Sequence, residues 1–474
     1  MPPTRSAFSR LRLIRSLLAL PLLCTAIALC PAVVDAAESS SSLSASSQSV
    51  SDAAVVHGSF SSKYVFRKTR VDDDIFRDED LSSDLRLDIT KPLTNAYEFH
   101  FYGTLKNDFS KHRNSKDFSP FEDIGDTYHS ENHGYLYEAH LDLNEPISRV
   151  SQIRIGRQDG TRDEPVFFDG VATDIRVANG VNVTAYGGAA VHLYELNNKW
   201  GDDSLQGAGL DLRPATSTVI SMDFLHTDDK RTMADTTSRH DQLASFKLVQ
   251  RFSPNFRTTT KVRYENGDPR DASLRIIAAA PDLGLELNAS YLRQFRVQNE
   301  LSNELSPYYD VIGQSDPYQR TDAKLRKLFG SRAAIDIGYF QRTLIHPQQE
   351  GAFNRAYTRS YAVLAFSDLF VNGFSLSLTG EQWKSRERHV NASGFDAGYA
   401  FKKGRRSPKM NIGSYFSLYK YDYYLSLGER TRVRTNYVKL DYPFATRYAL
   451  SCAYEFERGL QEYQTAKLGI RYEF

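Results

Sequence analysis

Two stretches of the chain place histidines and carboxylates at matching positions. In the first, Glu98, His100 and Tyr102 alternate with aromatic residues. In the second, Leu136, Glu138, His140 and Asp142 alternate with Tyr135, Tyr137, Ala139 and Leu141. If the intervening loop joins two adjacent antiparallel strands symmetrically, residues whose numbers sum to about 240 face each other. The facing pairs are then His100 with His140, Glu98 with Asp142, and Tyr102 with Glu138.

These facing pairs suggest two kinds of chemistry. Two imidazoles with two carboxylates have the donor atoms of a divalent-metal site, and imidazoles also titrate near neutral pH. The same side chains could instead form a ladder of polar pairs hydrogen-bonded in water. His100 and His140 are therefore candidate metal ligands, and the sequence leaves both interpretations open.

Motifs of the common enzyme classes are absent from the sequence. It has no Gly-rich phosphate loop, no HExxH, no GxSxG, and no CxxC or CxxCH motif. We therefore expect no catalytic residue, no enzyme activity and no cofactor.

The segments that must position the candidate residues have a side-chain period of two, which is typical of β-strands. Asp84, Arg86 and Asp88 alternate with Leu85, Leu87 and Ile89, and similar segments recur to the end of the chain. Short turns and long polar loops alternate between them. The predicted short turns are 213–215, 253–255, 281–283, 403–409 and 442–446, and the predicted long loops are 107–133, 158–169, 195–204, 227–241, 297–321 and 343–356. The tally is about 22 strands, and 18 or 20 also fit.

The last eleven residues, Gln464 to Phe474, show the alternation most clearly. Ala466, Leu468, Ile470, Tyr472 and Phe474 share one face, and the other face is mostly polar. This ending resembles the C-terminal targeting strand of Gram-negative outer-membrane β-barrels, with Ile470, Tyr472 and Phe474 as the targeting residues. The resemblance implies an all-β, closed transmembrane antiparallel up-and-down barrel of about 22 strands (18–22), inserted into outer-membrane lipid by the barrel-assembly machinery. The short turns and both termini of such a barrel would face the periplasm, and its long loops would face the outside of the cell.

The N-terminal residues support the same destination. Residues 1–36 have a basic start, an apolar centre from Leu17 to Leu29 and small residues near Ala36, as a secretory signal peptide does. We expect a disordered Ser-rich periplasmic leader at 37–56 and the barrel at 57–474. Loss of the signal removes two of the three cysteines and leaves Cys452 without a partner for an internal disulfide.

The composition fits a barrel and gives no sign of a nucleic-acid partner. The chain has 28 Tyr, 28 Phe and a mean hydropathy of −0.47, as expected when an apolar band and aromatic girdles surround a wet interior. From 59 basic and 58 acidic residues, the signal removes four arginines and one aspartate, leaving 55 and 57. That near balance predicts no strong field for nucleic acid.

Charged and polar residues on the predicted inner face have both signs, which predicts weak ion selectivity. The predicted pore-lining residues are Asp84, Arg86, Asp88, Glu98, His100, Lys106, Glu138, His140, Asp142, Arg154, Asp174, Arg176, Lys261, Arg263, Glu265, Glu286, Lys467 and Arg471.

Two further features have two interpretations each. The acidic loop 107–133 resembles, in position, the loop that folds inward in general porins, or it lies over the rim. Tyr415, Tyr419, Tyr421, Tyr423 and Tyr424 would anchor the barrel at an interface or form an aromatic track for sugars.

The sequence as a whole predicts a porin-like channel for passive diffusion of small polar solutes. The main alternative is a structural barrel that sheathes a periplasmic or lumenal protein partner, such as a multihaem cytochrome in an electron-export complex. A third alternative is an outer-membrane enzyme.

Overall fold

The computed structural model describes residues 54–90, 96–110, 120–121, 132–159, 166–191, 203–229, 239–296, 316–401, 406–421 and 429–474. All of them belong to one compact unit, Ala53–Phe474. The predicted signal peptide and nearly all of the predicted leader lie outside the described residues.

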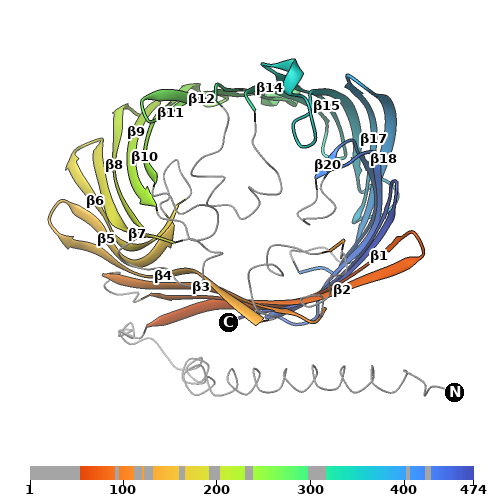
Figure 1. The fold of residues 1–474 in the computed structure, drawn as a ribbon, viewed down its shortest axis with the longest axis horizontal. Coiled ribbons are helices and arrows are strands. Elements are labelled where there is room, and N and C mark those ends of the chain that lie inside the picture. The colour runs from red at the N-terminus through yellow and green to blue at the C-terminus, as the bar shows by residue number, and fades with distance from the viewer. Residues whose placement is uncertain are drawn as a thin grey trace. The chain divides into compact units, whose positions relative to one another are not determined.

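Among the described residues, 22 antiparallel strands form one closed sheet (Figure 1). The first twelve are β1 (Val55–Val71), β2 (Asp74–Thr90), β3 (Tyr97–Asp108), β4 (Asn132–Ile147), β5 (Val150–Asp159), β6 (Phe167–Ala178), β7 (Val181–Ala190), β8 (Ser204–Ala215), β9 (Thr218–Asp229), β10 (Arg239–Ser253), β11 (Phe256–Glu265) and β12 (Asp268–Ala280). The others are β13 (Leu285–Gln294), β14 (Tyr318–Phe329), β15 (Ala333–Leu344), β16 (Tyr357–Ser367), β17 (Phe374–Ser385), β18 (His389–Ala400), β19 (Lys409–Ser417), β22 (Val433–Pro443), β23 (Tyr448–Arg458) and β24 (Glu462–Glu473).

Smaller elements lie between these strands. β20 (Lys420–Tyr421) and β21 (Glu429–Arg430) form a separate two-stranded sheet between β19 and β22. Two 3₁₀ turns are also present, η1 (Pro281–Leu283) and η2 (Pro347–Gln349). In the described part of the chain, no helix has the length and apolar character needed to cross a membrane.

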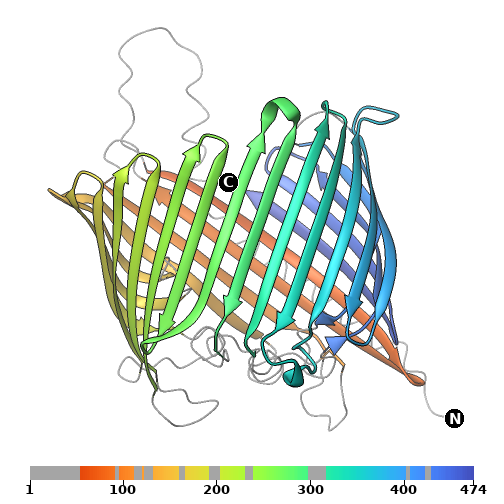
Figure 2. The same ribbon diagram turned by 90° about the horizontal axis from the view of Figure 1, so that it is seen from above.

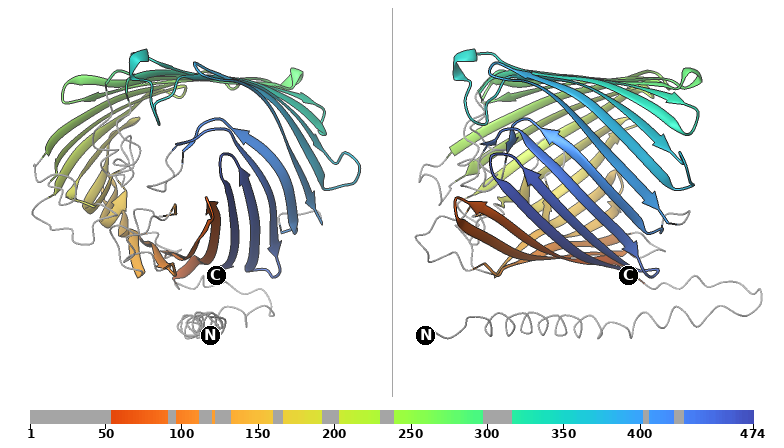
Figure 3. Two further views of the ribbon diagram at one scale, coloured as in Figure 1. Left: turned by 45° about the vertical axis from the view of Figure 1, so that its right-hand side comes forward. Right: turned by 90° about the vertical axis from the view of Figure 1, so that its right-hand side faces the viewer.

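The sheet closes where the last strand pairs with the first. β24 runs antiparallel to β1, from the pair Ser59 and Glu473 to the pair Thr69 and Tyr463. Beyond these pairs, the backbone N–H groups of Gly58 and Phe474 each donate to the other residue's carbonyl at 3.0 Å. This closure, with every strand next to its sequence neighbour, confirms the predicted up-and-down barrel and its strand number. The strands are tilted and wrap around the barrel, as the side views show (Figures 2 and 3).

The connections at the two ends of the barrel differ in length. The end that holds Phe474 has short connections, such as residues 254–255 and 281–284. The other end has the long ones, including 295–317 and 345–356. The predicted alternation is not strict, because residues 72–73 and 266–267 are short turns at the long-loop end.

Several predicted boundaries differ from the structure by a few residues. Residues 213–215 are the end of β8 rather than a turn, because β8 and β9 are joined by residues 216–217 alone. The barrel begins at Val55 rather than at 57, since Val55 and Val56 already pair with Thr90 and Ile89.

The seam between β1 and β24 generates a prediction about Gly58. A Cβ atom there would lie 2.4 Å from the Phe474 ring and 2.7 Å from the Arg86 carbonyl oxygen. Because the carbonyl is backbone and cannot rotate away, we expect Gly58→Ala to lower the free energy of unfolding by about 1–3 kcal/mol, as overpacking does. Denaturant unfolding in lipid vesicles measures this. The matched control is Gly380→Ala on β17, where a Cβ would have no neighbour within 4 Å, and equal unfolding midpoints for the two variants would contradict the prediction.

Candidate functional site: a histidine–carboxylate cluster on the inner wall

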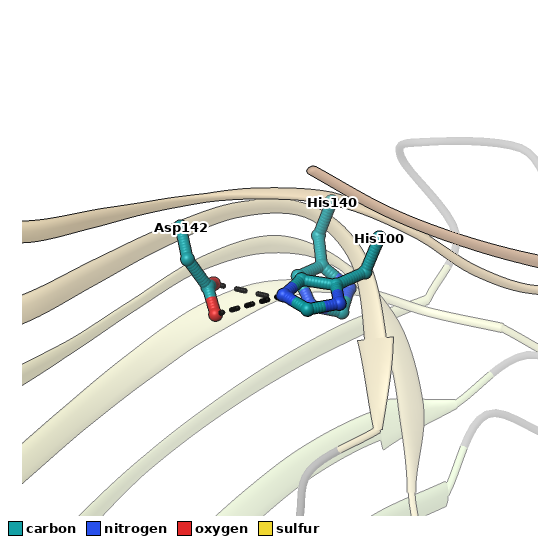
Figure 4. A group of neighbouring side chains, drawn as sticks. All are labelled: His100, His140 and Asp142. Carbon is teal, nitrogen blue, oxygen red and sulfur yellow. Dashed lines mark ion pairs between the residues drawn. The ribbon is translucent and has the colours of Figure 1, made fainter. Parts of the chain in front are cut away.

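Backbone register brings the predicted polar residues together in two rows across β2, β3, β4 and β5. In the first row Asp88 lies opposite His100, His100 opposite His140, and His140 opposite Gly156. The facing pairs His100 with His140, Glu98 with Asp142, and Tyr102 with Glu138 are those predicted from a symmetric connection. The second row joins Glu98 and Asp142 to Arg154 on β5. The side chains of His100, His140 and Asp142 point to the interior of the barrel (Figure 4).

Gly156 gives the first row the space that it needs. Its φ of +125° is in a region that side-chain-bearing residues rarely adopt. A Cβ at this position would also lie 2.3 Å from the carbonyl oxygen of Ala139. His140 therefore lies beside bare backbone on the β5 side, and its Nδ1 is 3.3 Å from the carbonyl oxygen of Arg157.

Asp142 is the most tightly held carboxylate of the cluster. Arg154 donates to its two oxygens, from Nε at 2.7 Å and from Nη2 at 3.0 Å. Gln152 donates to Oδ2 at 3.0 Å. Only 2% of Asp142 is exposed, and charge-assisted bonds of this kind compensate for the lost hydration of the carboxylate.

The two imidazoles are stacked and share an orientation. Their ring centroids are 4.9 Å apart with 29° between the planes. Each Nδ1 has an oxygen acceptor, since His100 Nδ1 is 2.7 Å from Asp88 Oδ1 and His140 Nδ1 bonds to backbone. In the neutral ring this arrangement places the proton on Nδ1 and the lone pair on Nε2.

Both Nε2 atoms face carboxylate oxygens. The distances to Asp142 are 3.8 Å from His100 and 3.9 Å from His140, which Figure 4 shows as dashed lines. Glu98 Oε2 lies 3.5 Å from His100 Nε2. Nitrogen and oxygen donor atoms therefore converge on one small volume beside the inner wall.

Several of the other predicted pore-lining residues contact opposite charges, hydroxyl groups or aromatic rings. Asp84 accepts from Thr104 at 2.6 Å, Arg86 lies over the Tyr102 ring at 5.2 Å, and Lys106 over the Tyr135 ring at 5.3 Å. The remaining contacts are Arg263 with Asp271 at 2.7 Å, Lys467 with Glu455 at 3.0 Å, Asp174 with Thr184 at 2.5 Å, and Arg471 with Glu473 at 3.4 Å.

For four more of the predicted pore-lining residues, the structure gives the opposite residue on the neighbouring strand or the degree of burial. Arg176 lies opposite Asn182, Lys261 opposite Ser273, and Glu286 opposite Arg326. Glu265, at the end of β11, is buried. None of these four is brought to the histidine cluster.

Strict alternation places Tyr135 and Tyr137 on the face opposite to His140, and this prediction is wrong. A β-bulge between β3 and β4 sets Tyr102 opposite Glu138 and Gly103 opposite Leu136, so Tyr137 is the extra residue. The bulge reverses the alternation beyond it. Tyr137 consequently stacks on Tyr102, with ring centroids 4.9 Å apart, and Tyr135 lies 6.1 Å from Tyr137.

The charged residues on the inner face of β14 to β17 were not among the predicted pore-lining residues. Lys324 pairs with Asp336 at 2.9 Å, and Arg359 pairs with Glu381 at 2.7 Å. A signal was present on β14, where Arg320, Asp322, Lys324 and Arg326 occupy every second position.

The tyrosines near the rim do not make one set of contacts. Tyr419 is buried with Trp383 and Leu418, whereas the Tyr421 ring lies against Phe353 at 5.4 Å. Burial raises the pKa of the Tyr421 phenol, and Glu429 raises it further. Tyr423 and Tyr424 lie outside the described residues, as does most of the loop 107–133.

Asp78, Asp80 and Asp108 form a second group of carboxylates within metal-binding reach of one another. Arg67 makes ion pairs with Asp78 and Asp80. The guanidinium therefore neutralises much of the negative charge that would attract a cation.

No family model matches the chain, and no curated protein matches it. Solved structures similar to it include the translocation pore of the P pilus usher PapC, with 10% identity over 88% of this chain and 99% of that chain, and a TM-score of 0.49. OpdQ of Pseudomonas aeruginosa has 10% identity over 89% and 98%, with a TM-score of 0.41. A BenF-like porin from Pseudomonas fluorescens Pf-5 has 9% identity over 89% and 98%, with a TM-score of 0.41. None of these likenesses assigns an activity to this chain.

The Arg154–Asp142 pair generates a stability prediction. Arg154→Met removes the main partner of a buried carboxylate, so we expect the free energy of unfolding to fall by about 3 kcal/mol. Arg471→Met is the matched control, because Arg471 and Glu473 are both more than half exposed and such pairs contribute about 0–1 kcal/mol. Denaturant titration of the two variants in vesicles makes the comparison, and a loss at Arg154 no larger than that at Arg471 would be evidence against a tightly coupled pair.

Proposed function

We propose that the protein is an outer-membrane channel of a Gram-negative cell through which small polar solutes diffuse passively. The observation that carries this proposal is the contrast between the two faces of one closed wall. Large apolar side chains are exposed on the outer face, and ion pairs cross from strand to strand on the inner face. A closed sheet with these faces satisfies its backbone in lipid and keeps a hydrated interior.

The side chains on the outer face support the proposed location in a membrane. Its exposed apolar residues include Leu287, Ile337, Leu364, Leu378, Ile412, Leu468 and Ile470. Aromatic pairs lie near the short-turn end, where a girdle would meet the lipid headgroups. They are Phe252 with Phe256, Phe370 with Phe374, Tyr399 with Phe401, and Tyr448 with Tyr472, at 5.1, 5.8, 5.0 and 4.6 Å between centroids.

The side chains on the inner face support the proposal that polar solutes pass through the barrel. Cations and anions on it pair across neighbouring strands, as Arg154 does with Asp142 and Lys324 with Asp336. Paired charges keep water at the wall but produce no ring of one sign, so selectivity between cations and anions would be weak. The proposed mechanism has no chemical step and needs no cofactor.

Targeting and orientation belong to the same proposal. Residues 1–36 would direct export, and the C-terminal strand with Ile470, Tyr472 and Phe474 would be recognised by the barrel-assembly machinery. The short-turn end, which holds Phe474, would then face the periplasm. Among the described residues, no feature favours the sheath alternative or the enzyme alternative.

Conductance in planar lipid bilayers tests the channel. We expect stepwise conductance and a reversal potential near zero in a KCl gradient. Lys324→Gln with Arg326→Gln leaves Asp336 without its cationic partners, so the reversal potential should shift towards cation selectivity. The control with the same charge change is Arg458→Gln with Arg471→Gln at the strand ends, where we expect a smaller shift.

Folded protein that inserts but shows no conductance steps would contradict the proposal. Co-purification of a haem protein with such silent barrels would instead favour the sheath alternative.

A further inference from the structure

We propose that His100, His140, Asp142 and Glu98 form a binding site for a divalent transition-metal ion of the Zn²⁺ class. The site lies on the inner wall across β3 and β4. It does not depend on the proposed channel function, because it would exist in a barrel of any function.

The orientation of the two imidazoles suits metal binding. A metal-binding histidine usually donates its other ring N–H to a carboxylate or a backbone carbonyl, which fixes the ring and its tautomer. His100 has Asp88 at 2.7 Å in that position, and His140 has the Arg157 carbonyl at 3.3 Å. Both rings therefore direct an Nε2 lone pair to the same side.

The spacing of the candidate ligand atoms also suits a metal ion. One donor atom each from His100, His140 and Asp142 lies within 4.8 Å of the others. Ligands about 2.0–2.1 Å from a tetrahedral ion are about 3.3 Å apart. His100 Nε2 is 3.5 Å from Glu98 Oε2 and 3.8 Å from Asp142 Oδ2, and His140 Nε2 is 3.9 Å from Asp142 Oδ1. Each of these three distances exceeds the tetrahedral spacing by about 0.2–0.6 Å.

The charge at the site also suits a cation. Three carboxylates, Asp88, Glu98 and Asp142, contact the imidazoles, and Arg154 pairs with one of them, Asp142. A carboxylate has about four lone-pair positions, so Asp142 can bind a metal while Arg154 and Gln152 still donate to it. Two imidazoles with carboxylates favour Zn²⁺, Ni²⁺ or Cu²⁺ over Ca²⁺ or Mg²⁺, which prefer all-oxygen ligands.

The experiment uses the whole protein, purified in detergent through an affinity tag without histidine and treated with a chelator. Calorimetric titration with Zn²⁺ measures the stoichiometry and affinity. Electron paramagnetic resonance with Cu²⁺ reports how many nitrogen ligands bind. We expect one ion per barrel, micromolar or tighter affinity, and splitting from two equivalent imidazole nitrogens.

Three variants separate ligands from their supports. His100→Gln with His140→Gln should weaken Zn²⁺ binding by about 100-fold or more and abolish the two-nitrogen Cu²⁺ signal. Asp88→Ala should keep that signal and weaken binding by about 10–100-fold, because it removes only the acceptor that orients His100. The matched control, His346→Gln with His389→Gln, removes two imidazoles outside the cluster and should bind as the unaltered protein does.

Unaltered protein that binds no Zn²⁺ or Cu²⁺ at micromolar concentration would overturn the proposal, as would equal affinity in the His100/His140 variant and its control. Either result would leave the four side chains as a hydrogen-bonded polar ladder. A shift in migration between heated and unheated samples on gels shows that each variant is folded, and the single substitutions His100→Gln and His140→Gln serve if the double variant is not.

Discussion

Backbone pairing around the whole circumference is the constraint on which the rest of the structure depends. A sheet in lipid cannot leave a row of N–H and C=O groups unpaired, because no water is present to satisfy them. β1 and β24 meet this requirement over the length from Ser59 to Thr69, and the Gly58–Phe474 bonds extend it to the last residue. The terminal aromatic ring lies against Gly58, where any side chain would obstruct it. The last residue is therefore part of the closure.

Once the wall is closed, the side-chain period of two assigns each residue to one of two environments. Apolar residues on the outer face need no partners, whereas charged residues on the inner face pair with the neighbouring strand. The histidine cluster is an instance of this cross-strand pairing in which both partners are imidazoles. Its neighbours on β2 and β5, Asp88 and Arg154, then fix the orientations of His100 and Asp142. Register thus brings the residues of the site together, and side-chain hydrogen bonds to the neighbouring strands define its geometry.

The sequence predicted the features that follow from local periodicity and symmetric connection. The strand number and closure were predicted correctly. The pairing of His100 with His140 also has the expected sum of 240, although pairs next to the loop, such as Asn107 with Asn132, sum to 239 and the extra residue Tyr137 makes up the difference. The inward position of Tyr137 was not predictable, since one extra residue in β4 has no compositional signature and reverses the alternation beyond it. The β20–β21 hairpin was also missed, because strands of two residues are too short to show a period. The convergence of Gln152 and Arg154 on Asp142 depends on side-chain conformation, which a one-dimensional pattern does not contain.

Site-directed spin labelling along β24 tests most directly whether lipid and water lie on opposite faces of this wall. Cys452 is replaced by Ser, single cysteines from 465 to 472 are labelled in vesicles, and collision rates with oxygen and with a water-soluble nickel chelate are measured. We expect collision rates with a period of two, with oxygen favoured at Ala466, Leu468 and Ile470 and the chelate favoured at the residues between them. Equal chelate access at Lys467 and Leu468, or no period at all, would contradict a membrane-spanning barrel with a hydrated interior.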